Sequence, residues 1–400
     1  MKILMVNKFL HARGGAETYM LELGDYFSSL GHVVEYFGME SPDNIVGNRW
    51  GLYTASMDFH GSSLISKASY PMKVIYSAEA RRKMRQILDA FQPDVVHINN
   101  FNYQLTPSIL LAAEEYRRAA GRKMPILYTA HDPQLVCPNH QLYRPAQNQI
   151  CEKCLDGSVL SCVRGKCIHD SVPRSILGAA EYLYWKHRSV YRILDRIICP
   201  SAFMKRKLDT DPVLADKTVV LHNYIKASPR IAPQKQNCVL YFGRFSEEKG
   251  IRTLLEVCRA LPQIPFVFAG SGPLEELVNS VPNVRNLGFL SGDALKDAVS
   301  SARFSVCPSE WNEDCPFSVL ESISLGTPVL GSVRGGIPEL IEPGRTGWLF
   351  PAGDADALRA EILRIWNSEE PEHFAANCRT AQLDSLSDYA QKLEALYRGE

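Results

Sequence analysis

Residues 304–321 read FSVCPSEWNEDCPFSVLE and contain the pattern that decides the fold. The apolar run Phe304–Cys307 predicts a short buried strand, a polar loop follows, and the apolar spacing after it predicts a helix. We expect Cys315 to be the N-cap of this helix and Pro316 its first residue. A strand, a loop and a helix in this order are typical of α/β proteins with a parallel sheet.

Two carboxylates lie in this stretch, Glu313 in the loop and Glu321 on the second turn of the predicted helix. Such carboxylates can accept hydrogen bonds from sugar or ribose hydroxyl groups. The spacing alone is a weak signal, because Glu is a common residue and an acid near a helix start can simply stabilise the helix. Its meaning therefore depends on which other motifs meet at the same place.

The same alternation of strand and helix fills the chain on both sides of this stretch. The strand runs are almost wholly apolar, which suits strands buried on both faces of a parallel sheet. We predict a doubly wound α/β architecture. The predicted strands are Ile3–Val6, Val33–Phe37, Val95–Ile98, Ile126–Thr129, Ile197–Cys199 and Val219–Leu221 in the first half, and Val239–Phe242, Phe266–Ala269, Val284–Phe289, Phe304–Cys307, Pro328–Gly331 and Trp348–Phe350 in the second.

A chain of 400 residues is too long for one typical core, so we expect two domains. Residues 1–225 are predicted to form an N-terminal Rossmann-like domain with a cysteine-rich insert at 137–169. The polar, proline-containing segment 226–237 is predicted to be a linker. Residues 238–383 would form a second Rossmann-like domain, and a helix within 384–400 would pack back on the first domain.

Composition excludes several function classes. Lys plus Arg and Asp plus Glu both number 44, so no overall positive charge attracts nucleic acid. We expect no transmembrane helix and no signal peptide, because the apolar runs are too short. The 11 cysteines are therefore expected in a reducing cytoplasm, as core residues, metal ligands or thiols.

Polar motifs follow several of the predicted strands. Gly14 and Gly15 precede the first predicted helix, Ala16–Leu30. Glycines with a positive φ and the free N–H groups of the helix start would suit an anion. A plain glycine turn explains the two glycines equally well. The pair His131–Asp132 follows another strand and could perform acid–base chemistry; an ordinary loop His and a capping Asp are the alternative.

The second half has further motifs of this kind. Arg244 and Lys249 lie between a strand and a helix and together suit a diphosphate, whereas two solvated surface cations are the alternative. The turn Gly270–Pro273 could let a nucleotide approach the backbone, with Pro273 at the first position of a helix; a tight structural turn explains it equally well. A glycine pair in Val333–Glu339 repeats the pattern.

The joint pattern resembles the retaining glycosyltransferases of the GT-B fold, in particular family 4 of nucleotide-sugar-dependent enzymes, over almost the full length. That fold has two Rossmann-like doubly wound parallel-sheet domains facing a cleft. The matching motifs are Gly14–Glu17, Gly243–Gly250, Gly270–Pro273, the Glu313 and Glu321 pair, and Gly335–Leu340.

The resemblance implies a role for each matching residue. Arg244 and Lys249 would bind the donor diphosphate, Glu321 the ribose, and Glu313 the transferred sugar. The implied catalytic residues are Arg244, Lys249, Glu313 and His131; the implied donor-binding residues are Gly14, Gly15, Gly243, Gly270, Ser271, Gly272, Cys315, Pro316, Phe317 and Glu321; Glu17 and Asp132 would lie on the acceptor side.

The resemblance also implies the reaction and its partners. The donor would be a UDP-, GDP- or ADP-sugar, the acceptor a glycan or a lipid-linked molecule, and the pathway surface polysaccharide or glycolipid biosynthesis, with no metal needed for catalysis. Retention by front-face attack is expected; an inverting enzyme would need a base, for which Asp132 is the candidate. A GT-B epimerase, a phosphorylase, or a non-catalytic nucleotide- or sugar-binding module are the alternatives.

The cysteine-rich region departs from the common family pattern. Cys151, Cys154, Cys162 and Cys167 could hold a structural zinc ion, with disulfides or free thiols as the alternatives. The stretches Arg81–Arg85 and Tyr182–Arg192 mix cations with apolar and aromatic residues. They could give the protein a peripheral contact with the inner face of the cytoplasmic membrane, although solvated helix faces are the commoner explanation.

Overall fold

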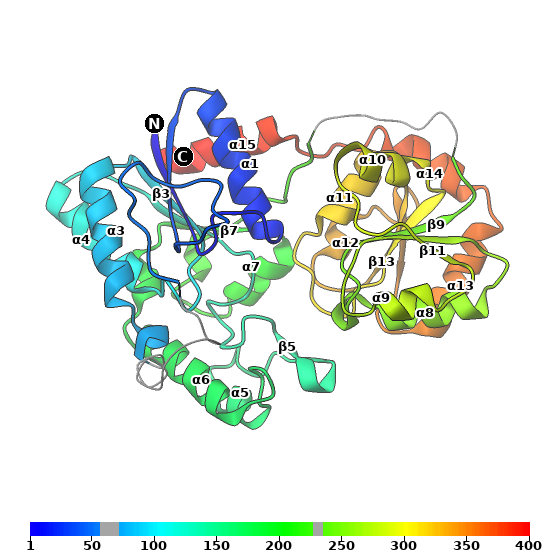
Figure 1. Ribbon diagram of the computed structural model, residues 1–400, viewed down its shortest axis with the longest axis horizontal. Helices are drawn as coiled ribbons and strands as arrows, with labels where there is room; N and C mark the ends of the chain where they lie inside the picture. The colour runs from blue at the N-terminus through cyan, green and yellow to red at the C-terminus, as the bar shows by residue number, and fades with distance from the viewer. Residues whose placement is uncertain (57–71, 227–234) are drawn as a thin grey trace. The chain divides into compact units, whose positions relative to one another are not determined.

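The computed structural model of the protein describes residues 1–56, 72–226 and 235–400 (Figure 1). These residues form two compact units. Unit 1 comprises Met1–Gln147, Cys151–Leu221 and Leu386–Glu400, and unit 2 comprises Asn148–Ile150 and His222–Ser385. Most of the linker predicted at 226–237 lies outside the described residues.

Unit 1 is built on a six-stranded parallel sheet with the order β2-β1-β3-β4-β7-β8. Its strands are β1 (Lys2–Asn7), β2 (Val33–Phe37), β3 (Val95–Asn100), β4 (Ile126–Thr129), β7 (Arg196–Cys199) and β8 (Thr218–Val220). A short ribbon pairs β5 (Tyr143–Arg144) with β6 (Gln149–Ile150). Because the chain leaves β1 for β2 and returns to β3 on the other side, the sheet order reverses between β1 and β3.

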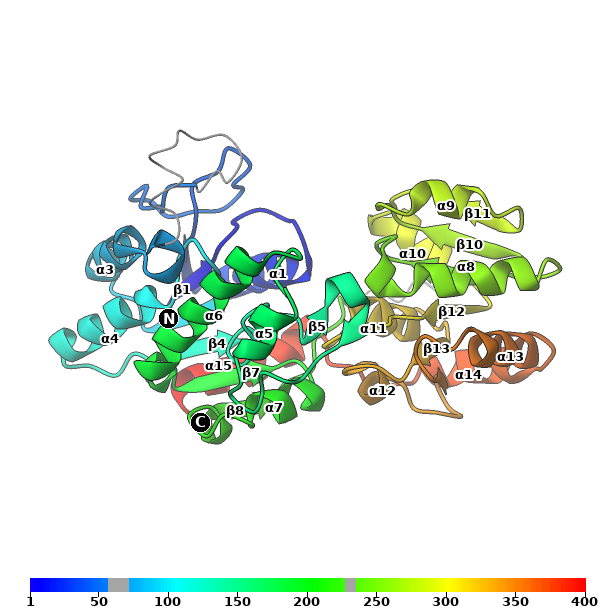
Figure 2. The same cartoon turned by 90° about the horizontal axis from the view of Figure 1, so that it is seen from below.

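Helices follow the strands of unit 1. They are α1 (Gly15–Ser29), α3 (Ala78–Phe91), α4 (Ser108–Ala120), α5 (Leu160–Arg164), α6 (Val172–His187), α7 (Ala202–Leu208) and α15 (Leu386–Arg398), with the 3-10 turns η1 (Pro145–Gln147), η2 (Val190–Ile193) and η3 (Ala215–Lys217). Serine side chains cap α3, α6 and α7, as Ser77, Ser171 and Ser201 each accept a hydrogen bond from a first-turn N–H. Figure 2 shows α5 beside α6.

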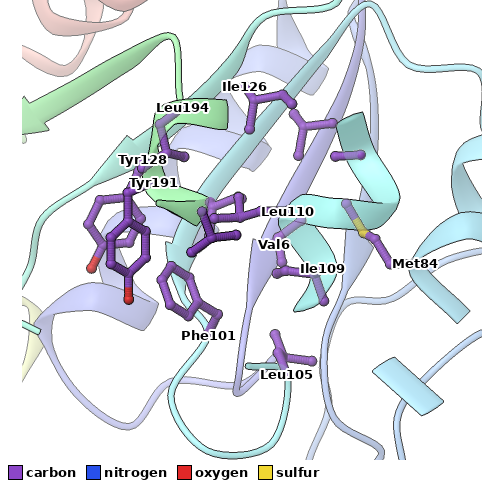
Figure 3. Close-up of a cluster of buried hydrophobic side chains, with 14 of the residues drawn as sticks. Val6, Met84, Phe101, Leu105, Ile109, Leu110, Ile126, Tyr128, Tyr191 and Leu194 are labelled. Atoms are coloured by element: carbon purple, nitrogen blue, oxygen red, sulfur yellow. The ribbon is translucent and has the colours of Figure 1, made fainter. Parts of the chain in front are cut away.

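The core of unit 1 forms where α3 and α4 cover one face of the sheet (Figure 3). Val6, Met84, Ile109 and Leu110 are fully buried there, and Tyr128 is almost so. Uniformly apolar strands require such cover on each face, which is why their sequence does not alternate with polar residues.

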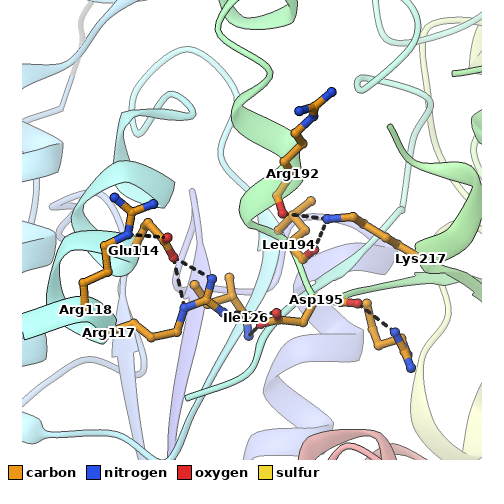
Figure 4. A network of polar contacts seen from close by, with 9 residues as sticks. Glu114, Arg117, Arg118, Ile126, Arg192, Leu194, Asp195 and Lys217 are labelled. Carbon is orange, nitrogen blue, oxygen red and sulfur yellow. Dashed lines mark hydrogen bonds and ion pairs between the residues drawn. The ribbon is translucent and has the colours of Figure 1, made fainter. Parts of the chain in front are cut away.

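Ion pairs fasten the opposite, amino-terminal ends of β4 and β7 (Figure 4). Arg117 on α4 donates to Asp195 at 2.8 Å and to Glu114 at 2.5 Å. Asp195 also accepts the backbone N–H of Ile126 at 2.8 Å. This end of the sheet is thus held by structural contacts, and the strand-end motifs lie at the other end.

The last helix, α15, belongs to unit 1 although unit 2 precedes it in the chain. It lies against α1 (Figure 1). The Tyr389 and Tyr19 hydroxyls are 2.7 Å apart, and the Tyr397 hydroxyl is 2.6 Å from Nδ1 of His97. Aromatic contacts and buried hydrogen bonds therefore hold the C-terminal helix on the first sheet.

Unit 2 has a second six-stranded parallel sheet, with the order β11-β10-β9-β12-β13-β14. Its strands are β9 (Val239–Phe242), β10 (Phe266–Ala269), β11 (Val284–Asn286), β12 (Phe304–Cys307), β13 (Val329–Ser332) and β14 (Gly347–Phe350). Its helices are α8 (Ile251–Ala260), α9 (Glu275–Asn279), α10 (Gly292–Ser301), α11 (Phe317–Ser324), α12 (Ile337–Leu340), α13 (Ala355–Trp366) and α14 (Glu370–Cys378), with the 3-10 turn η4 (Glu247–Lys249).

The predicted doubly wound parallel-sheet class is confirmed, and four local predictions are wrong. Gly14 has an extended backbone with φ −163°, so no positive φ is needed there. Pro316 is the N-cap of α11 and not its first residue. Pro273 precedes α9, and the strand expected to reach Phe289 ends at Asn286, whose side chain accepts the N–H of Gly288 and starts a turn.

Candidate functional site

The strand-end motifs of unit 2 meet at the reversal of its sheet. β9 pairs with both β10 and β12, so the chain winds outward from β9 and returns beside it. Ligands of open parallel sheets bind at the carboxyl ends of the strands at such a point. Arg244 and Lys249 follow β9, and Glu313 follows β12.

Glu313 is the centre of this site. Its Oε1 accepts hydrogen bonds from Lys249 Nζ at 2.5 Å, from Ser309 Oγ at 2.6 Å and from Trp311 Nε1 at 3.0 Å. The Glu313 side chain is 10% exposed and that of Lys249 is 27% exposed. The Lys249 ammonium also lies 5.5 Å from the ring centroid of Trp311. The two predicted residues thus form one partly buried ion pair.

Both groups of this pair are held in their charged forms. Burial alone would lower the pKa of Lys249, but the carboxylate of Glu313 outweighs burial and raises it. Burial alone would raise the pKa of Glu313, but Lys249 and the hydrogen bonds from Ser309 and Trp311 lower it. At neutral pH the site therefore holds a paired ammonium and carboxylate, with the positive end of the pair on Lys249.

The backbone of Glu313 is clamped by the glycine pair that follows β13. Gly336 N–H donates to the carbonyl oxygen of Glu313 at 2.7 Å. At Gly335 φ is +53°, and a Cβ would lie 1.8 Å from that same oxygen. Only glycine fits this position. The Val333–Glu339 motif thus positions the carboxylate loop.

Arg244 lies on an exposed loop whose shape is set by the glycine turn after β10. The N–H of Phe245 donates to the carbonyl of Ser271 at 2.8 Å. A Cβ on Gly270 would lie 1.9 Å from the carbonyl oxygen of Gly243. In the described residues, the Arg244 guanidinium has no ion pair or side-chain hydrogen bond, so it is available to an anion. The predicted donor-binding residues Gly243, Gly270, Ser271 and Gly272 therefore support the Arg244 loop.

The remaining predicted donor-binding residues of unit 2 lie at the start of α11. Cys315 is buried, and its carbonyl accepts a hydrogen bond from Asn223 at 2.9 Å. Pro316 is the N-cap, and Phe317 packs edge-on against Tyr224. Glu321 lies half-buried on the second turn of α11.

The strand-end motifs of unit 1 also lie where its sheet order reverses. Gly14 and Gly15 start α1 after β1, and Gly14 leaves room for the carboxylate of Glu17, whose Oε2 would lie 3.4 Å from a Cβ there. Glu17 is buried and accepts a hydrogen bond from Asn7 at 3.2 Å. Gly14 thus lets the carboxylate of Glu17 lie close to the N-terminus of α1.

His131 belongs to a buried polar network behind this edge. Its Nε2 is 3.1 Å from Asn99 Oδ1, and its ring packs edge-on against Tyr19 at 4.9 Å. Thr129 connects the Tyr19 hydroxyl to Nε2 of His97. Burial lowers the pKa of His131 to about 3. His131 is therefore neutral at physiological pH and suits hydrogen bonding more than proton uptake.

Asp132 has the opposite shift for the same reason. Burial raises the pKa of its carboxyl to about 6, although hydrogen bonds from Gln134 and Asn102 and the charge of Lys8 act against this rise. The N–H of Gln134 donates to Asp132 Oδ1 at 2.9 Å. An acid with a pKa near neutrality is suited to proton transfer.

The cysteine-rich insert folds into a small cluster of its own. Cys154, Cys162 and Cys167 are buried together, while Cys151 is half-buried. All four thiols are free, and a hydrogen bond with Cys162 lowers the pKa of Cys167 to about 7. Within the part of the chain that the structure describes, no three His, Cys, Asp or Glu side chains are arranged to hold a metal ion. Zinc binding by these cysteines stays a prediction.

Several cations of the two basic stretches are paired within the protein. Arg81 contacts Glu115, Arg85 pairs with Asp89 at 2.9 Å, and Lys186 lies 3.4 Å from Asp211. Among residues 1–56, 72–226 and 235–400, none of the helices combines the length and apolar content needed to cross a bilayer. Contact with a membrane surface stays a prediction.

Sequence reasoning missed several partners of the site. Ser309 and Trp311 bind Glu313, and Asn99 and Tyr19 position His131. Trp311 could have been found, because it lies two residues before Glu313 in a strand-end loop. The role of Tyr19 could not be predicted, because Tyr19 fits the ordinary spacing of buried residues on an apolar helix face.

Comparisons with known sequences agree with the strand-end motifs. The profile of Glycosyltransferase Family 4 matches residues 13–228, and that of Glycosyl transferases group 1 matches residues 226–381. The amylovoran biosynthesis glycosyltransferase of Erwinia amylovora is 33% identical over 180 residues, 40% of this chain and 44% of that protein. The sulfoquinovosyl transferase of Arabidopsis thaliana is 33% identical over 205 residues, 46% of this chain and 40% of that protein. The chain thus spans less than half the length of these relatives.

Solved structures share the whole architecture. Sucrose-phosphate synthase from Thermosynechococcus elongatus has a TM-score of 0.69 at 19% identity, covering 100% of this chain and 98% of that chain. HepE of Anabaena in complex with UDP-glucose has a TM-score of 0.66 at 15% identity, with both chains covered fully. At such identities the likeness shows a shared fold.

Proposed function

Because this chain belongs to glycosyltransferase family 4 and has the GT-B fold, we propose that it transfers a sugar from a nucleoside diphosphate sugar to a hydroxyl group. The donor is a UDP-, GDP- or ADP-sugar. The acceptor is a glycan or a lipid-linked molecule of surface polysaccharide or glycolipid biosynthesis. The reaction retains the anomeric configuration and takes place in the cytoplasm, at or near the inner face of the membrane.

The proposal is carried by the ion pair of Lys249 and Glu313, together with the exposed Arg244 that precedes Lys249 in the segment after β9. Both cations follow β9 at the reversal of the sheet, where a ligand of an open parallel sheet binds. Arg supplies a planar fork for phosphate oxygens and Lys a compact charge. These two side chains supply the positive charge, so the proposal requires no divalent ion.

In the proposed reaction, the bond between the anomeric carbon and the β-phosphate oxygen breaks, and the acceptor oxygen bonds to that carbon. The leaving diphosphate takes up the electron pair of the broken bond and receives the acceptor's proton. Arg244 and Lys249 stabilise the growing negative charge on the diphosphate, which lowers the barrier. Glu313 holds the transferred sugar, and Glu321 holds the ribose.

Relatives support this assignment. The amylovoran enzyme is named for polysaccharide biosynthesis, and a phosphatidyl-myo-inositol mannosyltransferase of Mycobacterium leprae is 25% identical over 186 residues, 43% of this chain and 50% of that protein. The HepE structure contains UDP-glucose. These names support a nucleotide-sugar donor and both acceptor classes.

A donor screen tests the proposal. UDP-, GDP- and ADP-sugars are incubated with the full chain, and released nucleotide and sugar products are followed by NMR, which also gives the anomeric configuration. We expect one donor to be turned over with retention, with slow hydrolysis when acceptor is omitted. Inversion would contradict the retaining mechanism. Epimerisation, phosphorolysis or binding without turnover would identify a different function.

A further inference from the structure

Unit 1 has a small recess beside Asp132 that the proposed reaction does not yet use. It lies between the loop after β3, the loop after β4 and helix α6, and the free space in it holds about one water molecule. Asn102 lines the recess and hydrogen-bonds to Asp132, so the recess adjoins the predicted acceptor-side carboxylate. The lining side chains that matter most are Tyr103, Gln134, His140 and Glu181.

The amide of Gln134 has unused hydrogen-bonding capacity in this recess. The residue is only 5% exposed. Its side-chain Nε2 and Oε1 are both buried, and neither has a hydrogen-bond partner among the described residues. A buried amide without partners is energetically costly, so native proteins rarely leave one unsatisfied. Gln134 lines the recess, so its amide is a polar group of the wall for which the described residues supply no partner.

The other polar groups of the recess are uncharged near neutral pH. Burial raises the pKa of the Glu181 carboxyl to about 8. Burial, and then the positive charge of Lys8, lower the pKa of His140 to about 3. The wall thus presents an amide, a carboxylic acid and a neutral imidazole. Such a wall suits an uncharged hydroxyl group better than a phosphate or a carboxylate.

Two residues of the wall have a strained backbone. Tyr103 has φ +59° and His140 has φ +63°, in the left-handed region that residues other than glycine seldom adopt. Their rings stack with centroids 5.3 Å apart and an interplanar angle of 20°. Strain of this kind persists where the surrounding structure imposes it, and it is concentrated at binding sites. The stacked pair gives the recess a flat aromatic side.

We propose that this recess binds one uncharged hydroxyl or hydroxymethyl group of a carbohydrate acceptor, with Gln134 and Glu181 as the binding residues. The proposal rests on the proposed function and names the part of the acceptor that unit 1 recognises. A sugar hydroxyl both donates and accepts a hydrogen bond, which matches the two free atoms of the Gln134 amide. The size of the recess limits it to one such group.

Saturation-transfer NMR with the full chain tests the proposal. The probes are methyl D-glucopyranoside, methyl D-galactopyranoside, methyl D-mannopyranoside and their 6-deoxy counterparts, with UDP present. We expect at least one probe to bind, and Gln134→Leu to weaken that binding about fivefold to tenfold, the effect of one lost hydrogen bond. The matched control is Gln86→Leu on the exposed face of α3, which should bind as the wild type does.

A second pair of variants examines the acid. Glu181→Gln keeps an uncharged donor and acceptor and should change binding by less than about threefold, whereas Glu181→Leu should weaken it as Gln134→Leu does. A second Gln134 variant covers the case in which Gln134→Leu does not fold. Gln134→Met keeps the side-chain length and then replaces it. Unchanged affinity in both Gln134 variants would overturn the proposal.

The outcomes separate this proposal from the proposed function. If a nucleotide sugar is turned over but no methyl hexoside binds, the recess holds a structural water only and the inference is rejected, while the proposed function stands. If a hexoside binds through Gln134 but no nucleotide sugar is used, the recess is a carbohydrate site and the proposed function fails.

Discussion

The ion pair of unit 2 leads to a quantitative prediction. Two unit charges at the 2.5 Å separation of Lys249 Nζ and Glu313 Oε1 attract each other by about 6–7 kcal/mol at an effective dielectric constant of ~20, before desolvation is subtracted. Removing one partner of a fully buried pair costs about 3–5 kcal/mol, because the other charge is left uncompensated. The Lys249 side chain is 27% exposed, so we expect about 2 kcal/mol for either single substitution.

A double-mutant cycle measures this coupling. Glu313→Gln keeps the oxygen that Ser309 and Trp311 bind but removes the charge, and Lys249→Met keeps the length of the side chain. Urea unfolding, followed by tryptophan fluorescence and circular dichroism and fitted with one transition for each unit, gives the free energies of unfolding. The double variant should be only about 2–3 kcal/mol less stable than the wild type, because no charge remains unpaired. If the sum of the two single costs equals the cost of the double variant to within about 0.5 kcal/mol, the two side chains are not coupled, and the pair does not exist as described.

Three further predictions follow from the same contacts. Gly335→Ala should destabilise unit 2 by about 3 kcal/mol or more in urea unfolding, because its Cβ would meet the Glu313 carbonyl oxygen at 1.8 Å; a loss below about 1 kcal/mol would contradict the clamp. The folded-state pKa of Glu181 is raised to about 8, so below that pH the folded protein holds a proton that the unfolded chain releases. The free energy of unfolding should therefore fall as the pH rises towards 8, by ~1.4 kcal/mol per pH unit at most. Thermal melts should show a flatter pH dependence in Glu181→Gln, and identical slopes would refute the shift. Excess EDTA should leave turnover within about twofold, because side chains supply the charge; activity lost to EDTA and restored by Mg²⁺ would refute this.

The strand positions were predictable because strands buried on both faces leave unbroken apolar runs in the sequence. Val239–Phe242 and Phe304–Cys307 begin and end as expected. Ends set by a single side chain were not predictable. Asn286 stops β11 through one hydrogen bond to Gly288, and periodicity does not encode such a contact.

The position of the candidate site was predictable, because the carboxyl ends of parallel strands lie at the same edge of a sheet. The sequence placed Arg244, Lys249 and Glu313 after strands, and the strand order then brings β9 beside β12. That Lys249 and Glu313 bind each other was not foreseen, because their sequence separation says nothing about side-chain direction. The recess at Gln134 was missed for a similar reason, since an unsatisfied amide is visible only once its surroundings are packed.

Calorimetric titration of the full chain with UDP, GDP, ADP and the matching nucleosides tests the central claim most directly, namely that Lys249 and Arg244 bind the diphosphate of the donor. We expect the wild type to bind one diphosphate clearly more tightly than its nucleoside. Lys249→Met should weaken the diphosphate at least tenfold, or about 1.4 kcal/mol, and should leave the nucleoside unchanged. Equal affinity of wild type and variant for that diphosphate would contradict the account.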